Sequence, residues 1–185
     1  MVSPILTRTT AAEFDALVDR PENADKILEL IAGEVIEAPS NPASSKYSAR
    51  ISGYLFVYLL QHDIAHLTGE AGGYWVSGER YAPDVAVLLK ARQPELADHG
   101  YNPLAPDLAV EVDYPSSVES RRNLSLKIVN YLNAGTKVWV VLPERRQVEV
   151  YVPGESPRIL DDSETLSVPD ILPGFSLPVA TIFNA

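Results

Sequence analysis

The chain has 185 residues, a formal net charge of −10 and no cysteine. This length suits one domain with a substantial core, and a hydrophobic content of 46% is ordinary for a globular protein. The absence of cysteine excludes disulfides and thiolate metal sites. We find no apolar run of about 18 residues and no signal-peptide pattern at the N-terminus, so we expect no membrane segment and a cytoplasmic location.

The negative charge also argues against a broad basic face for nucleic acids. Three basic pairs could still form a local rim, namely Arg121-Arg122, Arg145-Arg146, and Lys46 with Arg50. Ordinary solvated surface is the alternative interpretation of each pair.

The first predicted elements are a short helix and a hairpin. Thr10 and Glu13 have the spacing of a capping box, which predicts a helix over residues 10–19. Residues 26–31 and 34–38 then flank a tight Ala32-Gly33 turn and predict two antiparallel strands. One of the acids Glu29 and Glu34 could point inward, although both could equally face solvent.

A longer amphipathic helix follows a loop at residues 39–42. Tyrosine, leucine and isoleucine recur at three- and four-residue steps from Tyr47 to about Gln61, and Ser44 or Ser45 could cap the helix. Two weak strands are expected near residues 64–69 and 74–77. His62 and His66 are four residues apart and could share a helical face, but no zinc motif accompanies them.

Two apolar runs that contain Pro-Asp organise the middle of the chain. They are Tyr81–Leu89 and Ala105–Asp113, and both have the length and valine content of buried strands. Carboxylates in such strands are costly to bury unless they are paired or hold a cation, so Asp84, Glu111 and Asp113 require a partner. The polar segment from about residue 90 to 105 could be a lid, a binding loop or a short helix.

The remaining elements are a helix and several strands. The apolar stripe from Leu124 to Leu132 predicts a helix over residues 123–134, which Gly135 ends. Lys127 borders that stripe, so its side chain could reach the sheet beneath or extend to solvent. We expect strands near residues 137–142, 147–152 and 158–160, and then an ordered C-terminal wrap over the core. No repeat or linker divides the chain, so residues 1–185 are expected to form a single domain of α/β (α+β) class.

Two acids and a lysine on adjacent elements suit metal-dependent hydrolysis of phosphodiesters. Asp84 and Glu111 could hold Mg²⁺, and Glu111 and Asp113 project to one strand face. Lys127 could orient water or stabilise charge on the phosphate. A lysine–carboxylate pair that serves only the structure is the alternative.

These residues, in this order, resemble the Uma-type family of restriction-endonuclease-like proteins within the PD-(D/E)xK nuclease superfamily. The resemblance extends from about Leu28 to Phe183. It is carried by the hairpin, by residues 82–87 and 106–112, by Lys127 with the strand after it, and by the Leu172–Phe175 motif. It implies a central mixed sheet flanked by helices, with an extra hairpin region.

For function, the resemblance implies DNA cleavage that depends on magnesium, with manganese as a substitute. The implied metal ligands are Asp84 and Glu111, with Asp113 as a further candidate. Lys127 is the implied catalytic lysine, Glu29 or Glu34 the additional acid, and a homodimer is a common arrangement in related nucleases.

The chain departs from the family pattern in three places. Asp113 stands where the superfamily often has its lysine, Ser48 replaces an early helical histidine, and Tyr114-Pro115-Ser116 replaces a Ser-Pro-Ser turn. Two alternatives therefore remain open. One is an inactive nucleic-acid-binding or regulatory module on the same fold, and the other is a structural protein whose acids merely pair with Lys127.

Overall fold

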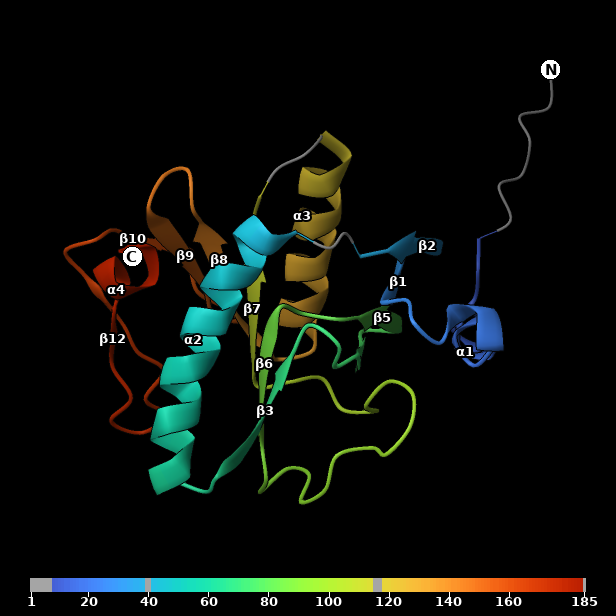
Figure 1. Ribbon diagram of the computed structural model, residues 1–185, viewed down its shortest axis with the longest axis horizontal. Helices are drawn as coiled ribbons and strands as arrows, with labels where there is room; N and C mark the ends of the chain where they lie inside the picture. Colours follow the sequence, from blue (N-terminus) through green and yellow to red (C-terminus); the bar gives the residue numbers. More distant parts are fainter. Residues whose placement is uncertain (1–7, 39–40, 115–117, 185) are drawn as a thin grey trace.

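A six-stranded mixed sheet forms the centre of the molecule, and its strand order is β10-β9-β8-β7-β6-β3 (Figure 1). The structure is a computed structural model that describes residues 8–38, 41–114 and 118–184. The strands are β3 (Ala65–Gly69), β6 (Val85–Leu89), β7 (Leu108–Val112), β8 (Lys137–Leu142), β9 (Gln147–Tyr151) and β10 (Arg158–Leu160). Strands β7 and β8 are parallel and the other neighbours are antiparallel.

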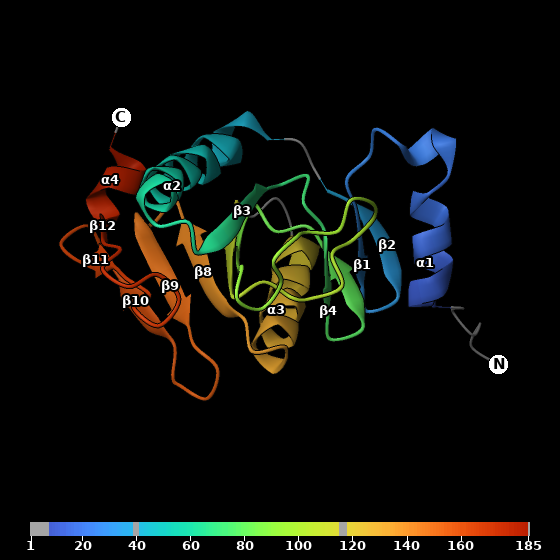
Figure 2. The same cartoon turned by 90° about the horizontal axis from the view of Figure 1, so that it is seen from below.

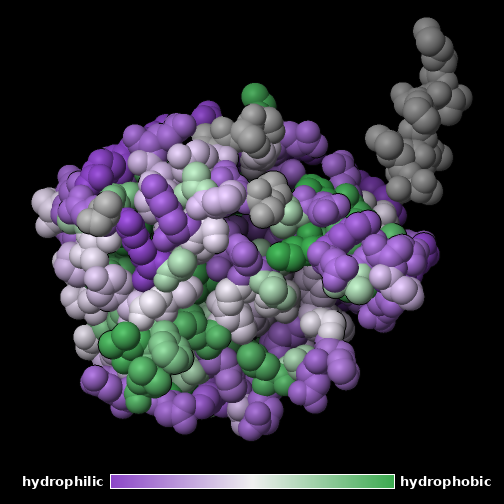
Figure 3. Space-filling view, in the orientation of Figure 1, coloured by the Kyte–Doolittle hydropathy of each residue, from purple (hydrophilic) through white to green (hydrophobic). Residues whose placement is uncertain are grey.

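Two helices cover opposite faces of this sheet, as Figure 2 shows. Helix α2 (Pro42–Gln61) packs on one face, and α3 (Val118–Asn133), which connects the parallel strands β7 and β8, packs on the other. Along β6, Val85 and Val87 face α2 whereas Ala86 and Leu88 belong to the core under α3. Burial on both faces explains why the strand sequence is continuously apolar. On its outer side, α2 carries apolar side chains at the surface (Figure 3).

A smaller antiparallel sheet of order β2-β1-β5-β4 lies beside the main one. Its strands are β1 (Leu28–Ile31), β2 (Glu34–Glu37), β4 (Tyr74–Val76) and β5 (Glu79–Tyr81). Helix α1 (Ala11–Val18) packs Phe14 against Leu28 and Leu30 of β1. The chain passes from β5 of the small sheet directly into β6 of the large sheet, so Asp84 lies at the junction of the two.

The C-terminal segment packs against the α2 side of the main sheet. It contains β11 (Thr165–Leu166), β12 (Leu177–Pro178) and α4 (Val179–Phe183). At the other end of the chain, a 3-10 helix, η1 (Pro21–Asn23), follows α1. Leu172, Phe175 and Leu177 are buried in the same core cluster as α2. The predicted ordered wrap is confirmed. No helix in the described part of the chain is both long and apolar enough to cross a bilayer.

Most predicted elements are present, with differences at their ends. The Thr10–Glu13 capping box and the hairpin form as expected, and Ala32 and Gly33 have φ values of 52° and 79°. The expected serine cap on α2 is wrong, because Asn41 accepts the hydrogen bond from the Ala43 N–H instead.

The histidine pair and the long polar segment can also be compared with the structure. His62 caps the end of α2 whereas His66 lies in β3, so the two histidines do not share a helical face. Residues 90–107 contain no helix or named strand, which leaves a long connection between β6 and β7. Parts of the expected loop at residues 39–42 and of the expected Tyr114-Pro115-Ser116 turn lie outside the described residues.

Candidate active site

Five of the predicted side chains line one pocket of about 210 Å³ between the two sheets and α3, namely Glu29, Asp84, Glu111, Asp113 and Lys127. Asp84 comes from the β5–β6 junction, Glu111 from β7, Lys127 from the middle of α3 and Glu29 from β1. Strands β6 and β7 pair Val85 with Val110, and this antiparallel register places Asp84 opposite Glu111. The pairing therefore brings the two acids together from positions far apart in the sequence.

Lys127 connects two carboxylates inside the pocket wall. Its Nζ lies 2.8 Å from Glu29 Oε1 and 2.8 Å from Glu111 Oε1. All three side chains are buried. A lysine with so little exposure needs charged partners, since an unpaired ammonium would lose its hydration without compensation. The prediction left open whether Lys127 reaches the sheet or extends to solvent, and the structure shows that it reaches the sheet.

Further hydrogen bonds fix the three carboxylates in place. The Tyr131 hydroxyl donates to Glu111 Oε1 at 3.0 Å, and the Ala82 N–H donates to Glu29 Oε1 at 2.8 Å. The Val112 N–H donates to Asp84 Oδ2 at 2.6 Å. Backbone N–H groups thus orient Glu29 and Asp84, and a side-chain hydroxyl orients Glu111, before any ligand arrives.

Burial sets the protonation of the cluster. It raises the pKa of Glu111 to about 7, and the nearby charge of Lys127 limits that rise. Burial also raises the pKa of Asp84 above its usual range. For Lys127, burial alone would lower the pKa, but the Glu111 and Glu29 carboxylates together raise it above its ordinary value. Lys127 therefore remains an ammonium at neutral pH, whereas Glu111 titrates near neutrality.

The donor chemistry of the pocket fits a hard divalent cation that takes only a few of its ligands from the protein. Asp84 and Glu111 offer carboxylate oxygens, and Mg²⁺ is often held by one or two carboxylates, with water and substrate phosphate completing its shell. In the parts of the chain that the structure describes, no group of three or more acidic or histidine side chains could hold a metal together. This favours two carboxylates rather than a complete protein cage.

The other two candidate acids lie differently. Glu34 is exposed on β2 and does not line the pocket, so of the two hairpin acids it is Glu29 that contacts the cluster. Asp113 directly follows the last residue of β7 and lines the candidate pocket together with Glu111. It also lines a second pocket of about 240 Å³.

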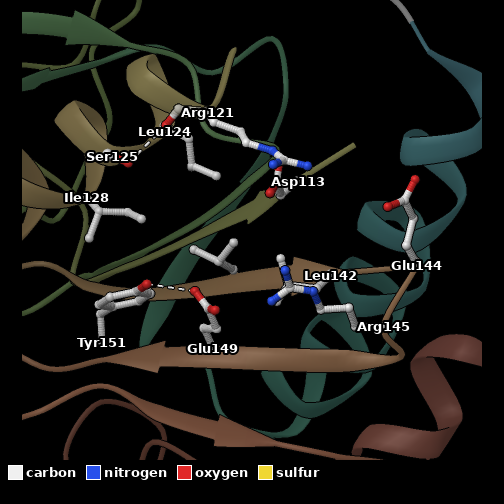
Figure 4. A pocket seen from close by; sticks show the side chains of 11 residues that line it. Asp113, Arg121, Leu124, Ser125, Ile128, Leu142, Glu144, Arg145, Glu149 and Tyr151 are labelled. Carbon is white, nitrogen blue, oxygen red and sulfur yellow. Dashed lines mark hydrogen bonds between the residues drawn. The ribbon is translucent and has the colours of Figure 1, made fainter. Parts of the chain in front are cut away.

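This second pocket lies between α3 and strands β8 and β9 (Figure 4). Arg121 and Asp113 lie close together in it, and burial raises the pKa of Asp113 while Arg121 opposes the rise. Arg121 and Arg145 face this pocket, so members of two predicted basic pairs are near the candidate site.

Tyr131 and the Ala82 N–H belong to the site although neither was predicted in it. Tyr131 follows Lys127 by four residues on α3, and that spacing places both side chains on one helical face. The helical pattern could have identified Tyr131 as a partner of the same acids. The Ala82 N–H could not have been found from the pattern, because its contact depends on how β1 lies beside the β5–β6 junction.

Comparisons with known proteins identify the family and the fold of the chain. A sequence model of the family described as "Uma2: Putative restriction endonuclease" matches residues 11–180. A crystal structure from Anabaena variabilis ATCC 29413, described as a putative nuclease belonging to DUF820, matches with a TM-score of 0.78 and 22% sequence identity. The match covers 94% of this chain and 97% of that chain. A search of curated proteins gives no match. The predicted restriction-endonuclease-like fold, a central mixed sheet flanked by helices, is confirmed.

Proposed function

The chain belongs to the Uma2 family of putative restriction endonucleases, and we propose that it is a metal-dependent endonuclease that hydrolyses phosphodiester bonds in DNA. One observation carries the proposal. Asp84 and Glu111 lie opposite each other on paired strands, and the Lys127 ammonium contacts Glu111 in the same pocket. This combination offers oxygen ligands for a cation beside a fixed positive charge.

In this proposal Asp84 and Glu111 hold Mg²⁺, for which Mn²⁺ can substitute. The bound ion would supply Lewis-acid chemistry and a water of lowered pKa. Lys127 donates hydrogen bonds to the negative charge that develops on the scissile phosphate. It acts as a donor rather than a base, because its raised pKa keeps it protonated. Glu29 is a positioning residue that orients Lys127 and is itself held by the Ala82 N–H.

Calorimetric titration with Mn²⁺ is the first test, because it needs no knowledge of the DNA sequence. We expect the wild type to bind Mn²⁺ and the variants Asp84→Asn and Glu111→Gln to lose that binding. Glu34→Gln is a matched control, since Glu34 is an exposed acid of the neighbouring hairpin. Equal Mn²⁺ binding by the wild type and both site variants would refute the proposed metal site.

Cleavage of supercoiled plasmid with Mg²⁺ or Mn²⁺ is the second test. We expect Lys127→Met to lower the rate by about 100-fold or more, the usual effect of removing one donor to a developing charge. The control Lys137→Met removes a lysine whose partner, Asp170, is largely exposed, and it should leave cleavage unchanged. Unaltered cleavage by Lys127→Met would exclude the assigned role of that lysine.

A catalytically inactive DNA-binding module is the second candidate. It is favoured by the engagement of both Glu111 oxygens, one by Tyr131 and both by Lys127, which a cation would have to displace in part. The departure from the family pattern at Ser48, which replaces an early helical histidine, also favours it. The Ser48 side chain is buried, and its hydroxyl donates to the Ser45 carbonyl within α2. Fluorescence anisotropy separates the two candidates, because the inactive module would bind labelled DNA without any turnover when Mn²⁺ is present.

A further inference from the structure

Helix α2 has a second apolar face, which points to solvent. Its inner face packs Ile51, Leu55 and Leu59 into the core. The outer face carries Phe56, Val57 and Leu60, which are 54%, 58% and 68% exposed. Figure 3 shows apolar side chains gathered on the part of the surface where α2 lies. A helix that is apolar on both sides is normally covered on both sides.

The outer residues have the spacing of a helix-pairing seam. Ala49, Gly53, Phe56 and Leu60 follow one another at steps of four, three and four residues. This is the alternation of the a and d positions in a coiled coil, where the apolar seam of one helix packs into that of another. The spacing therefore indicates a helix as the occupant of this face.

Gly53 supplies an independent argument that a second helix approaches α2 closely. It is exposed in the middle of α2, where glycine disfavours the helix, and nothing within 4 Å would contact a Cβ added there. The packing within the chain thus gives no reason for a glycine at this position. A second backbone that crosses α2 at Gly53 would give one, since glycine allows helices to approach closely.

The charges at the two ends of the seam select the orientation of the second helix. Lys46 is exposed at the start of the seam, and Asp63, which pairs with Lys90 of its own chain and keeps a side chain 84% exposed, follows its end. An antiparallel copy of α2 places each Lys46 near Asp63 of the other molecule, whereas a parallel copy would oppose like charges. Gly53 lies close to the midpoint between Lys46 and Asp63, where the two-fold axis would pass.

We propose that this face binds a second copy of the same chain, forming a two-fold homodimer through antiparallel α2 helices. The seam is separate from the candidate site. Ser44 of α2 lines the candidate pocket from the inner side of the helix, opposite to Gly53, and no α2 residue lines the second pocket, so neither pocket contains a seam residue. Dimerisation and metal binding can therefore be lost independently of each other.

Analytical ultracentrifugation tests the proposal. A contact between two helices of this length is small, so we expect a dimer with a Kd on the order of 10 μM. Phe56→Glu should raise that Kd at least about tenfold, because it buries a carboxylate in the seam. Val129→Glu is the matched control, since Val129 is 55% exposed on α3 and lies outside the seam. Mn²⁺ titration of the same variants shows whether the candidate site is unaffected.

Cysteine cross-linking tests the geometry, and the chain has no cysteine of its own. Under mild oxidation Gly53→Cys should form a disulfide-linked dimer, because the two copies of residue 53 meet near the axis. Val129→Cys should stay monomeric. Lys46→Cys should also stay monomeric, and a cross-link there would replace the antiparallel arrangement with a parallel one. A wild type that remains monomeric at roughly 0.5 mM, well above the expected Kd, would overturn the proposal.

Discussion

The pair of contacts made by Lys127 yields a prediction about stability. Its Nζ lies 2.8 Å from one oxygen of Glu29 and 2.8 Å from one oxygen of Glu111, and all three side chains are buried. Lys127→Met removes the ammonium but keeps much of the side-chain volume. Two buried carboxylates then lose their common partner, and breaking such a pair from one side costs about 3–5 kcal/mol. Urea denaturation at pH 8 should show this loss in the free energy of unfolding.

The dependence on pH distinguishes this effect from lost packing. Without the ammonium, the pKa of each remaining carboxyl rises in the folded protein, so protonation stabilises the fold. The loss caused by Lys127→Met should therefore be smaller at pH 5 than at pH 8, whereas lost packing would be the same at both. Lys137→Met, which breaks an ion pair with the exposed Asp170, should cost less than about 1 kcal/mol. A loss below about 1 kcal/mol for Lys127→Met at pH 8 would refute the assigned electrostatics.

Three further predictions follow from neighbouring residues. Burial raises the pKa of Glu111 from 4.5 to about 7, so the stability that its protonated form contributes is complete below pH 4.5 and is lost as the pH rises through 7. This loss amounts to about 3 kcal/mol in the free energy of unfolding. Urea denaturation across that pH range should show that the decline is absent in Glu111→Gln. Tyr131→Phe removes the donor to Glu111 and should lower the free energy of unfolding by about 1–3 kcal/mol, an effect that should disappear in a Glu111→Leu background. Gly53→Ala should raise the stability of the monomer in urea by about 1 kcal/mol while weakening the dimer in ultracentrifugation, and an increase in both would contradict close helix approach at this residue.

The central strands and their acids could be predicted because burial on both faces leaves a clear pattern. Residues 85–89 and 108–112 are apolar almost without interruption, so carboxylates within or beside them are conspicuous. Lys127 could be identified from the helical pattern, since it borders the apolar stripe of a helix. The start of α2 was predicted wrongly although Asn41-Pro42 carries its signal, with a capping asparagine followed by proline in the first turn.

The choice between Glu29 and Glu34 could not be made from the sequence, and the reason lies in the order of the small sheet. The hairpin pattern shows that β1 and β2 pair, but it does not show which strand pairs with β5. Because β5 pairs with β1, β1 is interior and buried throughout, whereas β2 becomes an exposed edge. The position of the acid relative to the sheet edge, rather than its local sequence, decides whether it reaches the pocket.

This arrangement couples the small sheet to the candidate site. Glu29 accepts hydrogen bonds from the Ala82 N–H, at the passage between the two sheets, and from Lys127 on α3. The Lys127 ammonium therefore gains its second carboxylate only when β1 has docked beside the β5–β6 junction, while Asp84 and Glu111 are brought together by the pairing of β6 and β7. Glu29→Gln should accordingly leave Mn²⁺ binding by the two acids in place and lower the rate of plasmid cleavage. Loss of Mn²⁺ binding in that variant would instead make Glu29 part of the cation site.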